Sequence, residues 1–419
     1  MAEVHPLHFS EKVLFFIERN FKVISLVIIC IQVLKGTALY EHAYARSQYL
    51  WSYEYGFIKR GLIGTLVLWL NEDSLYRILG IINFFSYLSY FLFLYLLFHC
   101  IQQHSTTILQ KIMALLLLAS PLIIAIGSLL GYFDALILSI LIYAYLKFKG
   151  KKIPVIPFIL FAALALSIHE LALFFVVIPL LYLAWESPHT DKKRKNILIV
   201  ATILICLVYV VSVSGVNEIF NLRFAGRIEK YKHVLSTKTG ENFFTFFAGY
   251  ALNHSFLHDF KILRLGMLVP LLPVYGFFIL ISNWLVLQHL LPQKKYMESL
   301  LYLAACYGPL LIIVVGWDVD RFVCLSICTS FIVLLVVMDS HPTLALKKPG
   351  PLHLLFFALV VAVALLTYYP ISENYAEGET LISKNRQRVL LQYPDKWINN
   401  WKKLVLPYQS KFYPPANNQ

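Results

Sequence analysis

Four short polar clusters interrupt an otherwise apolar sequence, and they contain the side chains that could perform chemistry. Carboxylates and histidine can take a proton from a reacting hydroxyl, and Lys and Arg can hold a phosphate. Ionisable groups set among apolar residues are costly in a membrane and indicate functional sites. The clusters contain Glu54, Lys59 and Arg60; Tyr132 and Asp134; His169 and Glu170; and Asp318, Asp320 and Arg321.

Each cluster also has an interpretation without chemistry, which the sequence leaves open. Asp134 can cap the next helix, and the His169–Glu170 pair can form a solvated turn. The acids of the fourth cluster can pair with its arginine at the start of a helix. The two cations of the first cluster can bind lipid head groups. For Glu54, between Tyr53 and Tyr55, the alternative is weakest.

A further polar stretch, residues 215–263, carries Arg223 and Arg227 together with other basic and histidine residues. Arginine binds phosphate and diphosphate groups directly. Attraction to anionic lipid head groups explains the same composition.

The composition defines the setting of these clusters. Apolar residues make up 59% of the 419 residues and charged residues 14%, and the mean hydropathy is +0.69. This excludes disorder, a disulfide scaffold and a soluble enzyme. Much of the net charge of +13 is explained by cytoplasmic loops rich in Lys and Arg. Without a Gly-rich phosphate loop or zinc spacing, we expect membrane lipid and not nucleic acid as a partner.

The apolar segments predict an all-α fold, a polytopic transmembrane helical bundle with about 11 spans. Residues 61–70 (GLIGTLVLWL) are too short to cross and predict an interfacial helix in the first external loop. The predicted spans are residues 22–40, 78–100, 112–130, 134–147, 153–168, 171–185, 196–214, 264–285, 299–316, 322–338 and 352–369.

The positions of the basic residues predict the topology. If residues 61–70 do not cross and the N-terminus is cytoplasmic, the lysines of residues 147–152 and 192–195 face the cytoplasm, as the positive-inside rule requires. All four polar clusters then lie outside. We therefore predict a membrane domain over residues 1–369, with external loops 41–77 and 215–263, and a short external cap over residues 370–419.

This order of features resembles the GT-C superfamily of integral-membrane glycosyltransferases over roughly residues 20–215. As in that superfamily, one span precedes an external loop with an acidic residue, Glu54, and an interfacial helix. A second acid, Asp134, follows between the third and fourth spans. This chain carries Glu41 and Glu54 singly, where the family often has an acidic pair, and it lacks the soluble C-terminal domain of some members.

The resemblance implies transfer of a sugar from a polyprenyl-phosphate-linked donor to a glycan or lipid acceptor on the periplasmic or lumenal face. Glu54 is our candidate general base, and Asp134 a second carboxylate that orients the acceptor or a divalent cation. Lys59, Arg60, and Arg321 or Arg223, are candidates for holding the lipid phosphate. His169 and Glu170 would line the acceptor side.

Two other functions fit the same sequence. A surface-polysaccharide polymerase or ligase would use Arg223 and Arg227 of the long loop. A transporter or flippase of lipid-linked sugars or small solutes would bind near the midplane. For all three we expect a bacterial inner membrane, with the endoplasmic reticulum as the alternative.

Overall fold

The computed structural model describes residues 9–36, 48–50, 52–53, 61–70, 75–128, 131–214, 277–312, 319–341 and 351–366. Every regular element within these ranges is a helix, which confirms the all-α prediction for the described chain. The helices are α1 (Phe9–Gly36), α3 (Gly61–Leu70), α4 (Leu75–His104), α5 (Ile108–Ala119), α6 (Leu122–Ser128), α7 (Asp134–Phe148), α8 (Val155–Ile168), the π-helix η2 (Leu173–Val177), α9 (Ile178–Glu186), α10 (Lys192–Ser214), α13 (Phe277–Leu290), the short 3₁₀-helix η5 (Leu291–Gln293), α14 (Tyr296–Leu311), α15 (Val319–Ser340) and α17 (Pro351–Leu366).

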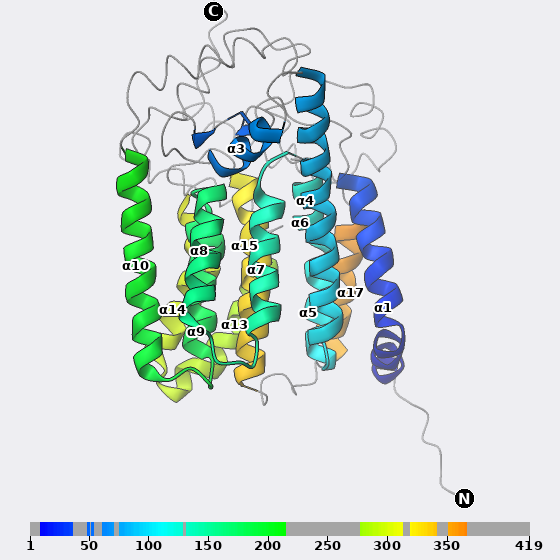
Figure 1. Cartoon of the computed structure of the whole chain (residues 1–419). Coiled ribbons are helices and arrows are strands. Elements are labelled where there is room, and N and C mark those ends of the chain that lie inside the picture. The colour runs from blue at the N-terminus through cyan, green and yellow to red at the C-terminus, as the bar shows by residue number, and fades with distance from the viewer. Residues whose placement is uncertain are drawn as a thin grey trace, which may run out of the picture.

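Each predicted apolar segment overlaps one of these helices, and the long helices lie side by side in one bundle (Figure 1). Within the described residues, three stretches are long and apolar enough to cross a membrane, namely Gly80–His104, Ile108–Gly127 and Arg321–Ser340. Crossing by the other segments stays a prediction, as do the number of spans and their orientation.

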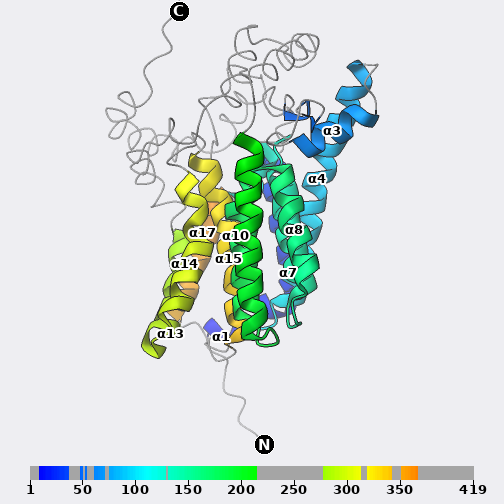
Figure 2. The same ribbon diagram turned by 60° about the vertical axis from the view of Figure 1, so that its left-hand side comes forward.

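Helix α3 has the same bounds as the predicted interfacial segment, Gly61–Leu70. It lies at one end of the bundle in both views (Figure 1, Figure 2) and packs against α4 and α8. We call this end the α3 end. The rest of the predicted external loops is largely outside the described residues, as is the whole predicted cap, 370–419.

The core is organised around α15, which is buried along nearly its whole described length and packs against α5, α6, α7, α9, α13 and α14. Helices at the rim differ from it. Phe84, Phe91 and Tyr95 of α4, and Leu207 and Val208 of α10, are exposed. Exposed apolar side chains in such numbers are typical of a surface that meets lipid.

The lysine-rich connections gather at the other end of the bundle, which we call the lysine end. Ser187 Oγ donates to Lys151 O at 3.1 Å, and Ile153 N–H donates to Thr190 Oγ1 at 3.3 Å. These bonds join the α7–α8 and α9–α10 connections, and the lysines of residues 147–152 and 192–195 lie in or next to these connections. These lysines lie at the end of the bundle away from α3 (Figure 1). That this end faces the cytoplasm stays a prediction.

Candidate functional site

A buried ion pair joins two of the predicted site residues at the α3 end. Arg321 Nε donates to Asp134 Oδ2 at 2.5 Å, and Arg321 Nη2 donates to Asp134 Oδ1 at 2.7 Å. Both side chains are almost fully buried. This two-point contact is the strongest form of the arginine–carboxylate interaction and fixes the plane of the guanidinium.

Asp134 reaches the arginine because of the turn before α7. Gly131 adopts a φ of 99°, a left-handed conformation that glycine takes without strain, and the chain enters α7 through Phe133. Phe133 occupies the N-cap position, and Asp134 is the first helical residue. Asp134 is therefore not the capping residue, although its charge still favours the positive end of the helix dipole.

Arg321 is the third residue of α15 and is held from two directions. Its guanidinium carbon lies 4.2 Å from the centre of the Tyr132 ring, a distance at which a cation is attracted to the ring face. A surface ion pair at a helix start was the alternative interpretation of this cluster, and it is wrong for Arg321, which is buried against another helix. Asp318 and the Asp320 side chain lie outside the described residues.

His169 and Glu170 follow α8 beside this pair. His169 is fully buried, so the solvated-turn interpretation is wrong for it, and its ring packs edge-on against Phe133 with centroids 6.5 Å apart. Leu171 N–H donates to His169 Nδ1 at 3.1 Å, and Glu170 Oε2 lies 3.1 Å from the same nitrogen. Nδ1 can accept from the backbone when the imidazole is neutral, or donate to Glu170 when it is protonated.

The segment before α3 contacts the same region. Tyr53 N–H donates to Thr65 Oγ1 at 2.8 Å, and Tyr53 OH donates to Ser167 O at 3.2 Å. Burial raises the pKa of Tyr53 to about 12, so its hydroxyl stays a donor at neutral pH. The ring of Tyr49 packs against Phe133, with centroids 4.9 Å apart. The first predicted loop is thus attached to the turn that carries Asp134.

A π-helical turn directly follows His169 and Glu170. In η2 the N–H of Ile178 bonds to the carbonyl of Leu173, five residues earlier. Such turns are rare and occur often at functional sites. Pro179, at the start of α9, cannot donate a backbone hydrogen bond, and it was the signal in the sequence for this irregularity.

We define the α3-end site as Tyr53, Tyr132, Asp134, His169, Glu170 and Arg321. The structure brings Asp134 and Arg321 into contact and places His169 next to them through Phe133. Tyr49, Tyr53 and Phe133 were not candidates, because their hydroxyl and ring contacts depend on helix packing. The other candidates lie outside the described residues, namely Glu54, Lys59, Arg60, Arg223 and Arg227.

The geometry limits what Asp134 can do chemically. Both carboxylate oxygens already accept hydrogen bonds from the Arg321 guanidinium. Asp134 is therefore better suited to holding Arg321 than to removing a proton. In the described part of the chain, no group of three or more His, Cys, Asp or Glu side chains is arranged to hold a metal ion, and the divalent cation stays a prediction.

Comparisons with known proteins found no matching family model, no similar curated protein and no similar solved structure.

Proposed function

We propose that this protein is a multi-pass membrane glycosyltransferase. It moves a sugar from a polyprenyl-phosphate-type carrier to a glycan or lipid acceptor, on the periplasmic face of a bacterial inner membrane. The observation that carries the proposal is the buried Asp134–Arg321 pair, which lies at the end of the bundle away from the lysines.

A buried guanidinium supports this function because the leaving group of the reaction is an anionic lipid phosphate. Burial of Arg321 costs free energy that only a well-placed carboxylate offsets, so the pair holds a cation in a fixed position next to Tyr132. In the proposed reaction Arg321 attracts the carrier phosphate, and Asp134 positions Arg321. Lys59 and Arg60 would add charge from the first loop.

The proposed reaction is a single displacement that inverts the anomeric carbon. The acceptor hydroxyl oxygen forms a bond to that carbon as the bond from the carbon to the phosphate oxygen breaks. The hydroxyl proton passes to the Glu54 carboxylate, and the lipid phosphate leaves with the electron pair. His169 and Glu170 would contact the acceptor. Tyr53 supports this role for Glu54, since its contacts hold the chain next to Glu54 against the site.

The test is Glu54→Gln in proteoliposomes supplied with tritiated hexoses on polyprenyl phosphate and with acceptors extracted from the native membrane. Loss of a general base lowers the rate by about a hundredfold or more. Glu41→Gln is the matched control, because it changes an acid of the same loop, and it should keep full transfer. A fully active Glu54→Gln protein would overturn the assignment of the base.

The same assay separates the two rival functions. A polymerase or ligase would join diphosphate-linked oligosaccharides and lose activity in Arg223→Gln or Arg227→Gln, but not in Glu54→Gln. A transporter would move the labelled lipid or solute across the vesicle without a covalent product. Either pattern would replace the glycosyltransferase proposal.

A further inference from the structure

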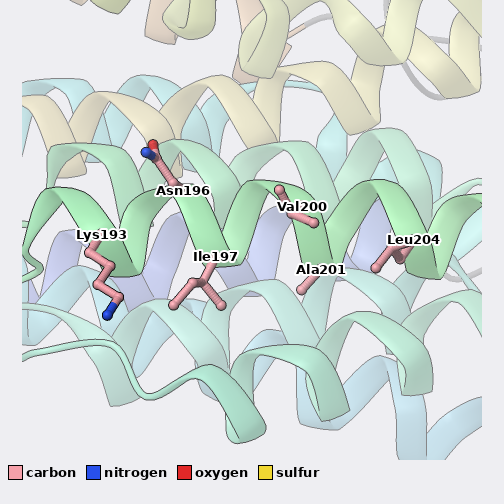
Figure 3. A pocket seen from close by; sticks show the side chains of 6 residues that line it. All are labelled: Lys193, Asn196, Ile197, Val200, Ala201 and Leu204. Atoms are coloured by element: carbon pink, nitrogen blue, oxygen red, sulfur yellow. The ribbon is translucent and has the colours of Figure 1, made fainter.

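A shallow pocket lies along one face of α10 and contains none of the residues of the α3-end site. Its volume is about 430 Å³. The lining side chains follow the helix at three- and four-residue spacing, so they form one stripe (Figure 3): they are Lys193, Asn196, Ile197, Val200, Ala201 and Leu204.

The stripe changes from polar to apolar in one direction. Lys193 and Asn196 lie at the start of α10, at the lysine end, and the four residues that follow are aliphatic. The aliphatic part continues into the exposed apolar rim formed by Ile203, Leu207 and Val208. This order, a cation and an amide followed by hydrocarbon, matches a phospholipid that lies along a helix with its phosphate at the membrane surface.

The charge near the polar end favours an anionic lipid. Lys193 lines the pocket, Lys192 precedes it in the chain, and both residues are exposed. The nearest acid in the sequence, Asp191, is already paired with Lys152 at 3.7 Å, and it accepts a hydrogen bond from Arg194 N–H at 2.8 Å. The polar end of the pocket is therefore cationic, and a zwitterionic head group would leave part of that charge unmatched.

The length of the stripe fits one leaflet. From Lys193 to Leu204 the helix advances eleven residues, or about 16 Å at about 1.5 Å per residue. Half of a typical hydrocarbon core is about 15 Å. One acyl chain would thus be covered from its ester group to near its end.

We propose that this pocket binds one anionic glycerophospholipid from the leaflet at the lysine end. Its phosphate contacts Lys193 and Asn196, and one acyl chain lies along Ile197, Val200, Ala201 and Leu204. The site rests on the membrane insertion contained in the proposed function, but not on sugar transfer.

The test is native mass spectrometry of the full chain titrated with phosphatidylglycerol and, separately, phosphatidylcholine of the same acyl chains. We expect the first anionic lipid to bind about fivefold more tightly than the zwitterionic lipid, which is the contribution of one lysine near an anionic group. Lys193→Gln should remove this preference, whereas Lys192→Gln, the matched control, should keep most of it.

A second pair of variants tests the hydrocarbon part. Ala201→Trp fills the pocket and should weaken binding of both lipids, whereas Val208→Trp, on the same helix outside the pocket, should not. Equal affinities for the two lipids, or equal effects of Lys193→Gln and Lys192→Gln, would overturn the head-group site. Equal effects of the two tryptophan variants would show general lipid contact along α10 and contradict a defined acyl-chain site.

Sugar transfer measured on the same samples is a separate readout, because lipid binding without transfer would contradict only the glycosyltransferase proposal.

Discussion

Helices α7 and α15 are joined by an ion pair at each end, and the two pairs have opposite polarity. At the α3 end the acid, Asp134, belongs to α7 and the base, Arg321, to α15. At the lysine end the base, Lys149, directly follows α7, and the acid, Asp339, belongs to α15, with Nζ and Oδ1 2.8 Å apart. Both pairs form together only if the two helices run in the same direction.

The two pairs differ in burial and in geometry. At the α3 end the side chains are 6% and 4% exposed, and both oxygens of the carboxylate are bound by one guanidinium. At the lysine end both side chains are 25% exposed. There the lysine makes a single contact with the acid, while Tyr145 OH donates to Asp339 Oδ2 at 2.8 Å.

Two ion pairs between the same helices can therefore differ in how much they contribute to stability. A lysine–aspartate pair that is partly exposed contributes less than a fully buried one when it is broken. A buried arginine–aspartate pair is strongly destabilising when only one partner is removed, because the other charge is left in an apolar environment. The geometry at the α3 end is therefore the more rigid one, as a binding site for a charged group requires.

The largest expected effect comes from breaking one partner at each end. Arg321→Gln leaves Asp134 buried without its cation, and we expect it to lower the free energy of unfolding by about 3–5 kcal/mol. Lys149→Gln should lower it by less than about 1 kcal/mol, since Asp339 is partly exposed and keeps its hydrogen bond from Tyr145. Denaturant unfolding of the detergent-solubilised protein, followed by tryptophan fluorescence, measures both.

The double variant Asp134→Asn/Arg321→Gln serves as the control for this experiment. It removes both charges, so it should recover part of the stability that Arg321→Gln loses. Equal losses in Arg321→Gln and Lys149→Gln would show that burial does not distinguish the two pairs.

A smaller effect is expected when the charge is kept and the geometry is changed. Arg321→Lys retains a cation beside Asp134 but loses the planar two-point contact. If Arg321 attracts the carrier phosphate, sugar transfer should fall by about tenfold, equivalent to one hydrogen bond made in the transition state. Lys149→Arg, the reciprocal change at the lysine end, should leave transfer unchanged. The proteoliposome assay measures both variants. Unaltered transfer by the Arg321→Lys protein would contradict the assignment of Arg321 to the carrier phosphate.

The sequence predicted the elements better than their contacts. Long continuous apolar runs favour helices in a membrane, because a helix satisfies its backbone groups within one segment, and residues 61–70 were correctly delimited as a short helix. The break between α5 and α6 was missed. Ser120 is extended there, with a ψ of 164°, because the residue before Pro121 avoids the helical region.

The sequence predicted individual residues of the candidate site but not which of them contact each other. Asp134 and Arg321 were both candidates, but they are 187 positions apart, and one sequence does not indicate which helices pack together. The pair at the lysine end was missed altogether, because Asp339 falls just outside the predicted span 322–338 and Lys149 was used for the topology alone. Aromatic contacts such as Tyr132 on Arg321 depend on the same packing.

The smallest expected effect on stability comes from cysteine labels that compare the two ends directly. One label is Leu70→Cys, at the end of α3, and the other is His189→Cys, in the α9–α10 connection. Both positions are exposed. Each change should alter the free energy of unfolding by no more than about 0.5 kcal/mol. Both are made with Cys30→Ser, because Cys30 is the exposed cysteine among the described residues.

A membrane-impermeant maleimide applied to intact cells should label the Leu70→Cys variant at once. It should label the His189→Cys variant only after permeabilisation, since lysine-rich connections stay in the cytoplasm. The reverse labelling pattern would put Arg321 on the cytoplasmic side, where a periplasmic sugar transfer could not use it.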